Sequence, residues 1–400
     1  MIINSMFKNL KPGIVKVLSK LSWPGLKGYF RWDYFLFFVV VWLSFSCQKG
    51  NVEQHQQTTG YVVDTVLIDS KGRILDLAAY MQASDLSDDG SSFFLYNHHD
   101  LSIDEINLDR KEFVKSYPLE AEGPNGVGQF IFGIQVLGDS LIFLKSVPFS
   151  SIIDKHGYVI QKVDWLSTKD TNGVQLNIAP PRMEAVVGSK EWRVVGTNLD
   201  FGKKTAFLGV FSLSQNQVTN VDIDPERSFP NYFLNVDNNF RDPWVYLHAD
   251  ERFVYVSHTY SNEIILLNPE GKIIKVVHYE PKLTPRRANY PEVLDGTREQ
   301  INREEQKLLE QVTFQAPVWD GVNRRYFRLS AKRIFGDGSE NAEPPQTMVF
   351  LSLFDAAFNL VSEMELEELH DEHFKYFAKD GKLWVSQNFS DELGFLVFDF

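Results

Sequence analysis

The chain has 400 residues and a formal net charge of −13 at neutral pH. Hydrophobic residues make up 44% and aromatic residues 14%, which is enough for a large buried core and excludes an intrinsically disordered chain. The acidic balance argues against nucleic-acid binding through phosphate contacts, and the single cysteine excludes an internal disulfide and a zinc site built on cysteines.

An apolar run near the N-terminus predicts an export signal. Residues 35–45 read FLFFVVVWLSF, which is too short to span a bilayer comfortably but is typical of a signal-peptide core, and basic residues precede it. Cys47 follows Ser46 directly, as in a bacterial lipobox. We therefore expect residues 1–46 to be a signal peptide and Cys47 to carry a lipid anchor. The alternative is an uncleaved membrane anchor in which Cys47 is incidental.

The polar residues that follow predict a tether. Residues 48–60 read QKGNVEQHQQTTG and show no hydrophobic periodicity. Such a stretch favours a flexible linker, so residues 47–60 are interpreted as a tether that leads to a domain over residues 61–400.

One pattern of short strands and polar turns recurs through the rest of the chain. Its clearest copy has strands at 253–257, 263–267 and 273–277, and Pro269-Glu270-Gly271 forms the last turn. Equivalent strands begin near Ser92, Leu141, Arg193, Phe253, Tyr326 and Leu383. Repeats of this kind are typical of a β-propeller with four-stranded blades, here with loop insertions. The pattern predicts an all-β fold with six blades, or seven if residues 347–354 open their own blade.

The two ends of the pattern predict how the ring of blades closes. The last copy, 382–400, lacks its third strand, and residues 64–77 resemble a strand pair without a unit of its own. Pairing between the first and last segments would remove both free sheet edges, which could otherwise template aggregation. The alternative is an open sandwich of the same strands.

One stretch is predicted to be helical. Residues 297–312 are good helix formers, and Thr297 with Gln300 forms a capping box. The helix follows the proline-rich stretch 281–291 and lies in the longest interval between strand copies. We expect residues 281–312 to form an insertion on one face of the propeller.

Two stretches resemble a known family. The sequence GPNGVGQF at 123–130 is similar to the G-x-G-P-G-x-F element that opens blades in six-bladed propeller lipoproteins of Bacteroidota, with Val127 inserted between two glycines. The sequence FQAPVWDGVNRRYFRL at 314–329 resembles a blade start in the lipoprotein family called domain of unknown function 4221. The resemblance implies a TolB-like, six-bladed propeller at the cell envelope. It implies no catalytic residue.

Three clusters of histidines and acids were weighed as metal sites. They are His370-Asp371-Glu372-His373, His98-His99-Asp100 and the acidic stretch 85–89. Two histidines three residues apart could share a helix face, and acidic loops can hold calcium. None has the full spacing of a known metal motif, so we interpret all three as solvated turns or connections. The prediction is no metal and no cofactor.

Two stretches on either side of the helix combine arginines with aromatic and acidic residues. On an acidic chain, clustered arginines are suited to binding a carboxylate or sulfate, and a tryptophan can stack on a sugar. The candidate binding residues are Arg286, Arg287, Tyr290, Trp319, Asp320 and Arg325. The alternatives are ion pairs from the arginines to the helix residues Glu299, Glu304 and Glu305, and burial of Trp319 between blades.

These features predict a lipid-anchored protein of the cell envelope. Gln48 after the cysteine favours the outer membrane, because it is not an Asp-type retention signal. The expected role is non-enzymatic binding of a protein, peptide or glycan, and not of nucleic acid. The alternative is a hydrolase or lyase that uses the central pocket, since propellers host both activities. Convergent polar side chains with shifted pKa values at the centre would favour the enzyme, and an aliphatic plug there would favour binding.

Overall fold

The computed structural model describes residues 60–400 apart from residues 171, 176–179, 189–190, 201–204, 238, 251–252, 337–344 and 372–374. The predicted signal peptide and Cys47 therefore lie outside the described residues. Within the described part of the chain, no helix combines the length and the apolar character that crossing a membrane requires.

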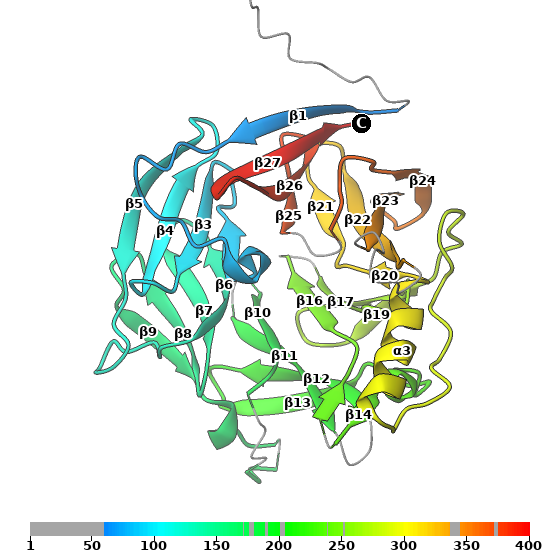
Figure 1. Ribbon diagram of the computed structural model, residues 1–400. Helices are drawn as coiled ribbons and strands as arrows, with labels where there is room; N and C mark the ends of the chain where they lie inside the picture. The colour runs from blue at the N-terminus through cyan, green and yellow to red at the C-terminus, as the bar shows by residue number, and fades with distance from the viewer. Residues whose placement is uncertain are drawn as a thin grey trace, which may run out of the picture. The chain divides into compact units, whose positions relative to one another are not determined.

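Six antiparallel sheets, the blades, follow one another along the described chain around a common axis (Figure 1). From the inside outward, blade 1 consists of β2 (Ser84–Leu86), β3 (Ser92–Asn97), β4 (Ser102–Asn107) and β5 (Glu112–Pro118), blade 2 of β6 (Ile131–Leu137), β7 (Leu141–Ser146), β8 (Ser150–Asp154) and β9 (Val159–Val163), and blade 3 of β10 (Met183–Val187), β11 (Arg193–Asp200), β12 (Thr205–Ser212) and β13 (Gln217–Asp222).

The second half of the ring repeats this order. Blade 4 consists of β16 (Val245–Ala249), β17 (Val254–His258), β18 (Ile264–Leu267) and β19 (Ile273–Val277), blade 5 of β20 (Thr313–Phe314), β21 (Val318–Asp320), β22 (Arg325–Ile334), β23 (Gln346–Asp355) and β24 (Leu360–Glu365), and blade 6 of β25 (Tyr376–Lys379), β26 (Lys382–Phe389), β27 (Glu392–Asp399) and β1 (Val62–Leu67). Both β20 and β21 pair with β22, so they share the innermost position of blade 5.

The predicted number of blades is confirmed. Each of the six strand starts in the sequence marks the second strand of a blade: β3, β7, β11, β17, β22 and β26. The stretch 347–354 lies inside β23, which pairs with β22 from Ile334 opposite Gln346 to Arg325 opposite Asp355. It therefore does not open a seventh blade. The family-like stretch 314–329 begins blade 5, as the resemblance implied, and the stretch 123–130 leads directly into β6.

The closing strand pairs as predicted, but the prediction for residues 64–77 was partly wrong. Strand β1 lies antiparallel to β27, with Val62 opposite Asp399, and Figure 1 shows both at the outer edge of blade 6. This pairing excludes the open sandwich. Only β1 forms in the first segment, because Lys71 and Gly72 turn the chain with φ values of 51° and 81°. Arg73 then binds Asp100, which draws the following residues onto blade 1.

The core lies between the blades. Along β3, Phe93 and Leu95 pack against blade 6, whereas Phe94 and Tyr96 pack against blade 2. Successive side chains of a strand point to opposite faces, so a blade covered on both faces needs apolar residues at every position. Similar clusters fill the other four junctions between neighbouring blades. This double burial explains the large aromatic content of the sequence.

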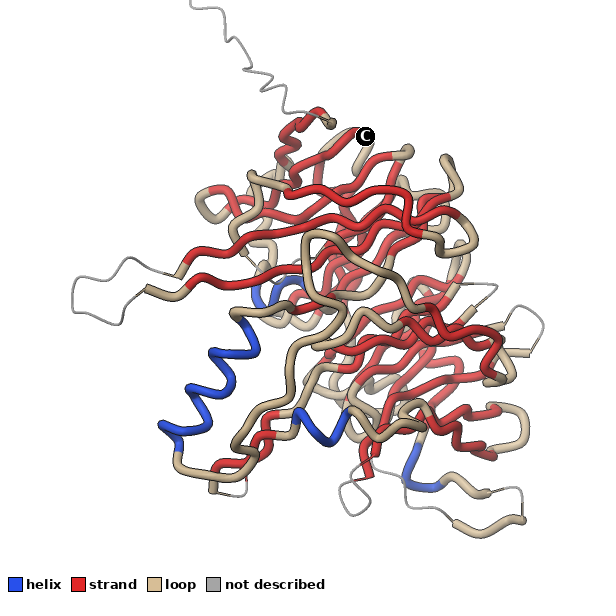
Figure 2. The backbone as a smooth tube through the Cα atoms, turned by 90° about the vertical axis from the view of Figure 1, so that its right-hand side faces the viewer, coloured by secondary structure: helices blue, strands red, loops and turns tan. Residues whose placement is uncertain are grey.

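The predicted helix is present as α3 (Arg298–Leu309). Thr297 and Gln300 form both bonds of the capping box. Ile301 and Leu308 pack near the small hairpin of β14 (Leu234–Val236) and β15 (Asn239–Arg241). Three short 3-10 helices complete the described elements: η2 (Ala78–Met81), η3 (Trp165–Ser167) and η4 (Phe229–Tyr232). Figure 2 shows α3 beyond the ends of the strands, on the side from which Figure 1 is viewed.

Candidate functional site

The two faces of the propeller differ in the connections they carry. The outermost strand of each blade joins the innermost strand of the next across one face, which we call the crossover face. It carries the insertion with α3 (Figure 2). The tight turns between first and second strands lie on the opposite face. Whether a residue lies in a crossover connection or in a turn between first and second strands therefore decides on which face it lies.

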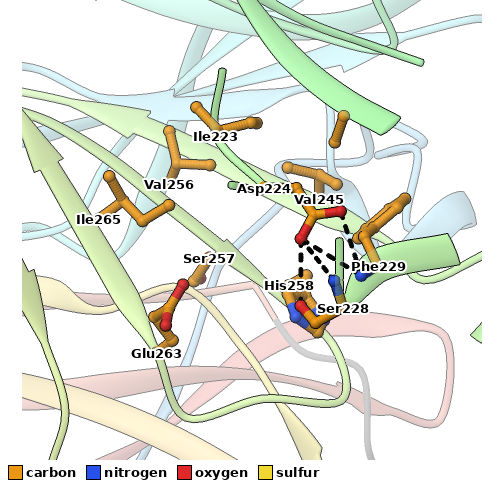
Figure 3. A pocket seen from close by; sticks show the side chains of 11 residues that line it. Ile223, Asp224, Ser228, Phe229, Val245, Val256, Ser257, His258, Glu263 and Ile265 are labelled. Atoms are coloured by element: carbon orange, nitrogen blue, oxygen red, sulfur yellow. Dashed lines mark hydrogen bonds between the residues drawn. The ribbon is translucent and has the colours of Figure 1, made fainter. Parts of the chain in front are cut away.

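A pocket opens on the crossover face between blades 3 and 4 (Figure 3). It is a small recess: the volume open to the centre of a water-sized molecule is about 20 Å³, which is room for about one water. The apolar wall consists of Ala206, Ile223, Phe229, Val245, Val256 and Ile265, and the polar groups are Asp224, Ser228, Ser257, His258 and Glu263. The apolar wall continues the core between the two blades. The pocket is therefore apolar within and polar at its rim.

The Asp224 carboxylate stabilises the backbone beside the pocket. It accepts hydrogen bonds from the backbone N–H and hydroxyl of Ser228, at 2.9 and 3.1 Å, and from the N–H of Phe229 (Figure 3). Burial raises the pKa of Asp224, although these bonds oppose the shift. The carboxylate fixes the turn that leads into η4, so it is a poor candidate for a catalytic base.

His258 and Glu263 face the pocket from blade 4. Burial, with the nearby charge of Arg328, lowers the pKa of His258 to about 3. The imidazole is thus neutral at neutral pH, and its Nδ1 accepts the N–H of Tyr260 at 3.3 Å, which makes Nε2 a donor. Burial raises the pKa of Glu263, and His278 at 3.6 Å opposes the shift. These groups can hydrogen-bond a polar, uncharged part of a ligand.

An aromatic chain connects the pocket to three of the candidate residues from the sequence. Phe229 contacts His258 at 5.5 Å between ring centroids, His258 contacts Tyr232 at 5.9 Å, and Tyr232 contacts Tyr290 at 4.9 Å. The Tyr232 hydroxyl donates to the Ala288 carbonyl at 2.6 Å. The segment 286–290 is therefore fastened beside the pocket.

Arg286 and Arg287 are exposed on this segment. Arg287 donates to the Tyr290 hydroxyl at 2.9 Å and lies over its ring, with 4.9 Å to the centroid. Arg286 pairs with Glu280 at 3.0 Å. The alternative partners on the helix, Glu299, Glu304 and Glu305, pair instead with Arg303, Lys307 and Arg241. Both guanidinium groups thus remain at the surface, where a ligand can reach them.

Trp319, Asp320 and Arg325 lie on the opposite face. They flank the turn between β21 and β22. Asp320 is 1% exposed and accepts from Arg325 Nε at 2.9 Å. Arg325 also donates to the Gly381 carbonyl of blade 6 at 2.8 Å, and Trp319 packs on Tyr326 in the core between blades 4 and 5. The structure therefore does not bring these residues together with Arg286, Arg287 and Tyr290.

The centre of the ring is polar. Asp85 of blade 1, His248 of blade 4 and Lys375 next to blade 6 are close enough for their charges to interact. Desolvation by the surrounding blades lowers the pKa of His248, whose side chain is still accessible to solvent, and of Lys375, and the charge of Asp85 opposes both shifts. Lys375 also donates to the Ser84 carbonyl at 2.5 Å, and Asp85 accepts the Val136 N–H at 2.8 Å. These bonds tie three blades together at the axis.

The other polar clusters fall in turns and connections. Asp100 is bound to Arg73, so it is not the acid that accompanies His98; Asp76 contacts His98 instead. In the stretch 85–89, Asp89 accepts from Ser87 and Ser91, as in an ordinary turn. His370 is exposed, and residues 372–374 lie outside the described residues. Sequence reasoning did not find the pocket residues Asp224, His258 and Glu263. A histidine at the end of the apolar strand 253–257 was the available signal.

The ring of six blades, the last of which combines β1 with β25, β26 and β27, makes this protein a six-bladed β-propeller. The chain belongs to the family described as domain of unknown function (DUF4221), which matches residues 57–365. No curated protein matches the chain.

Two solved structures illustrate the likeness. A member of the DUF4221 family from Bacteroides vulgatus is 14% identical, covers 85% of this chain and 97% of its own, and superposes with a TM-score of 0.60. A protein of Bacteroides fragilis that is described as exported is 8% identical, covers 84% and 94%, and gives a TM-score of 0.45. At these identities the first likeness shows a common fold, and it assigns no site.

Proposed function

We propose that this protein is a lipid-anchored, non-enzymatic binding protein of the cell envelope, with its partner on the crossover face. The observation that supports the proposal is the aromatic chain from the pocket to the exposed segment 286–290. A protein, peptide or glycan could place a hydroxyl or amide group at the mouth of the pocket and meet Tyr290 and the two arginines outside it. Aromatic rings with adjacent arginines are enriched where partners bind.

The polar groups of the pocket favour recognition over turnover. The Asp224 carboxylate is engaged by Ser228 and Phe229, and the His258 ring is neutral. A general base needs a pKa near the pH at which the protein works, and it has to be free to reach a substrate proton. The neutral imidazole of His258 instead supplies a hydrogen bond without a charge, and the Glu263 carboxyl group, whose pKa is raised by burial, lies in the same pocket. Such a lining suits hydroxyl or amide groups.

The anchor is the second part of the proposal. Cys47 follows an apolar run of signal-peptide length, and several acyl chains on one cysteine hold a protein stably at a membrane. We expect wild-type protein to take up an alkyne-labelled fatty acid in cells and to fractionate with the outer membrane. Cys47→Ser should lose the label and become soluble. Equal labelling of both proteins would remove the anchor from the proposal.

Site-specific photo-crosslinking in cells tests the binding face. A photoreactive amino acid at position 290 should capture a partner of defined mass. The same amino acid at position 110, in the β4–β5 turn of the opposite face, serves as the control. The product from position 290 should disappear with Arg286→Glu/Arg287→Glu. Arg110→Glu is the matched charge reversal, because Arg110 is likewise exposed and paired with one glutamate at 2.8 Å.

The outcomes separate binding from other roles. Capture at position 290 alone, lost with the double reversal and kept with Arg110→Glu, supports the crossover face. Equal capture at both positions, or a product that ignores the reversal, contradicts it. Mass spectrometry of the partner recovered after long incubation provides a further criterion, because a binding protein returns its partner chemically unchanged.

One observation favours the second candidate, a hydrolase or lyase. Asp85, His248 and Lys375 converge at the axis, and lowered pKa values are common among catalytic groups. Against this, the Lys375 ammonium and the Asp85 carboxylate are bonded to the neighbouring inner strands. A partner that is cleaved by wild type and returned intact by Lys375→Met would favour the enzyme.

A further inference from the structure

Asp76, His98 and His99 bring one carboxylate and two imidazoles together on the crossover face of blade 1. One ligand atom from each residue lies within 4.8 Å of the other two. Asp76 belongs to the connection between β1 and β2, whereas the two histidines directly follow β3. The three groups come from segments 22 residues apart in sequence, so no short motif reveals them.

A second layer of hydrogen bonds fixes the two segments to each other. Asp76 is 7% exposed and accepts the backbone N–H groups of Ala78 at 3.0 Å and His98 at 3.1 Å. Asn97 is 1% exposed, donates to the Ile74 carbonyl at 2.7 Å and accepts the His99 N–H at 3.1 Å. Both loops are therefore held by backbone contacts whatever the two rings do. Metal sites are built on outer hydrogen bonds of this kind.

The local charge favours a cation. Arg73 binds Asp100 at 2.7 Å and Asp104 at 3.0 Å. Together with Asp76, the three carboxylates exceed the one guanidinium by two negative charges. A divalent ion at the two imidazoles would balance them. A hydrogen bond from His98 to Asp76 explains that pair, but it does not explain why the second imidazole lies beside the first, with 4.1 Å between the ring centroids and the ring planes tilted by 35°.

We propose that Asp76, His98 and His99 bind a divalent first-row transition-metal ion such as Zn²⁺. Two imidazole nitrogens and one carboxylate oxygen are ligands that such ions prefer, whereas Mg²⁺ and Ca²⁺ select oxygen. Three protein ligands leave a coordination position for water. The bound ion joins the connection that follows the closing strand β1 to blade 1, so it also strengthens the closure of the ring.

Metal titration of the full chain in detergent tests this proposal. Cys47→Ser is the background for every sample, because a free thiolate binds zinc. After chelation, calorimetry with Zn²⁺ should give one equivalent, and Co²⁺ should give the visible absorption of an imidazole-bound ion. His99→Ala should weaken Zn²⁺ binding about tenfold or more, since removing even an outer partner of a metal ligand costs 10–100-fold. Excess Mg²⁺ or Ca²⁺ should not compete.

The matched control is His156→Ala, which removes an exposed histidine from the β8–β9 turn on the opposite face. It should bind like the background protein. Zinc should also raise the melting temperature of the background protein and of His156→Ala but not of His99→Ala, because only a ligand of the folded state stabilises it. The absence of stoichiometric binding overturns the proposal, and so does equal affinity in His99→Ala. The His99 ring is exposed, so this variant keeps the turn, which circular dichroism checks.

Discussion

Arg286 and Arg325 are both arginines paired with an acidic residue, but they lie at opposite ends of the strands. Arg286 is on the crossover face, where its side chain is 51% exposed and pairs with one exposed glutamate. Arg325 is on the opposite face, where it bonds to buried Asp320 and to a carbonyl of the next blade. The first is available to a partner, whereas the second holds blades 5 and 6 together.

The difference shows what an arginine contributes in each setting. An exposed ion pair adds little to the free energy of unfolding, because water and salt screen it. A buried carboxylate that receives several donors cannot lose them cheaply, because its charge then has no compensation. The region 319–325 should therefore respond to mutation through stability, and the region 286–290 through binding. Two predictions test that division, and a third tests the pocket beside the region 286–290.

The largest effect is expected at Asp320. Its carboxylate accepts from the Val322 N–H at 3.0 Å, the Asn323 side chain at 3.0 Å and Arg325. Asp320→Ala should lower the free energy of unfolding by about 3 kcal/mol, because it removes a carboxylate that is 1% exposed and leaves the partly buried Arg325 without its charged acceptor. Urea denaturation, monitored by tryptophan fluorescence, measures the loss of free energy. A change below about 1 kcal/mol, within the range of surface ion pairs, would show that the turn is not part of the framework.

A matched pair of arginine variants sharpens the comparison. Arg325→Ala should cost about 2 kcal/mol, because it removes charged hydrogen bonds to Asp320 and Gly381. Arg286→Ala should cost less than about 1 kcal/mol, as is usual for surface ion pairs. The same denaturation experiment compares both with wild type. Equal losses would mean that exposure does not distinguish the two regions, and the binding assignment of Arg286 would lose its basis.

Much of the fold could be predicted because its signals are local. The strand copies, the turn at 269–271 and the capping box of Thr297 each depend on neighbouring residues, and all three appear in the structure. The closing strand could also be predicted, because an incomplete last copy needs a partner. The sequence pattern does not show the innermost strands as separate elements, because several are short and lie next to irregular connections.

The candidate site was harder to predict for a physical reason. The pocket residues Asp224 and His258 come from different blades, and only packing between blades brings them together. The turn between β21 and β22 places Asp320 and Arg325 on the opposite face, although they and Tyr290 lie on either side of the same helix in sequence. A single sequence shows residue types and spacing, but it does not show which end of a strand a turn occupies.

The smallest expected effect concerns acid stability at the pocket. The pKa of His258 falls from its ordinary 6.5 to about 3 in the folded protein, so the folded state keeps the ring neutral while the unfolded state binds a proton. The neutral ring therefore contributes stability that is complete above pH 6.5 and is lost as the pH falls toward 3. The loss should approach about 1.4 kcal/mol per pH unit between these values.

The variant His258→Gln isolates this contribution. The charge of Arg328 acts on the His258 ring, and Asp224 and Glu263 line the same pocket. The raised pKa values of the two acids act in the opposite direction on acidification. Because both acids are present in wild type and variant, their effect largely cancels in the difference between the two stability curves. The wild-type curve should fall more steeply below pH 6.5 than that of His258→Gln, whereas exposed His156→Gln should follow wild type.

Parallel curves for wild type and His258→Gln would mean that the imidazole is solvated and protonated in the folded protein. Tyr290 would then mark the rim of a charged site, and an acidic ligand group would become the better expectation for this face.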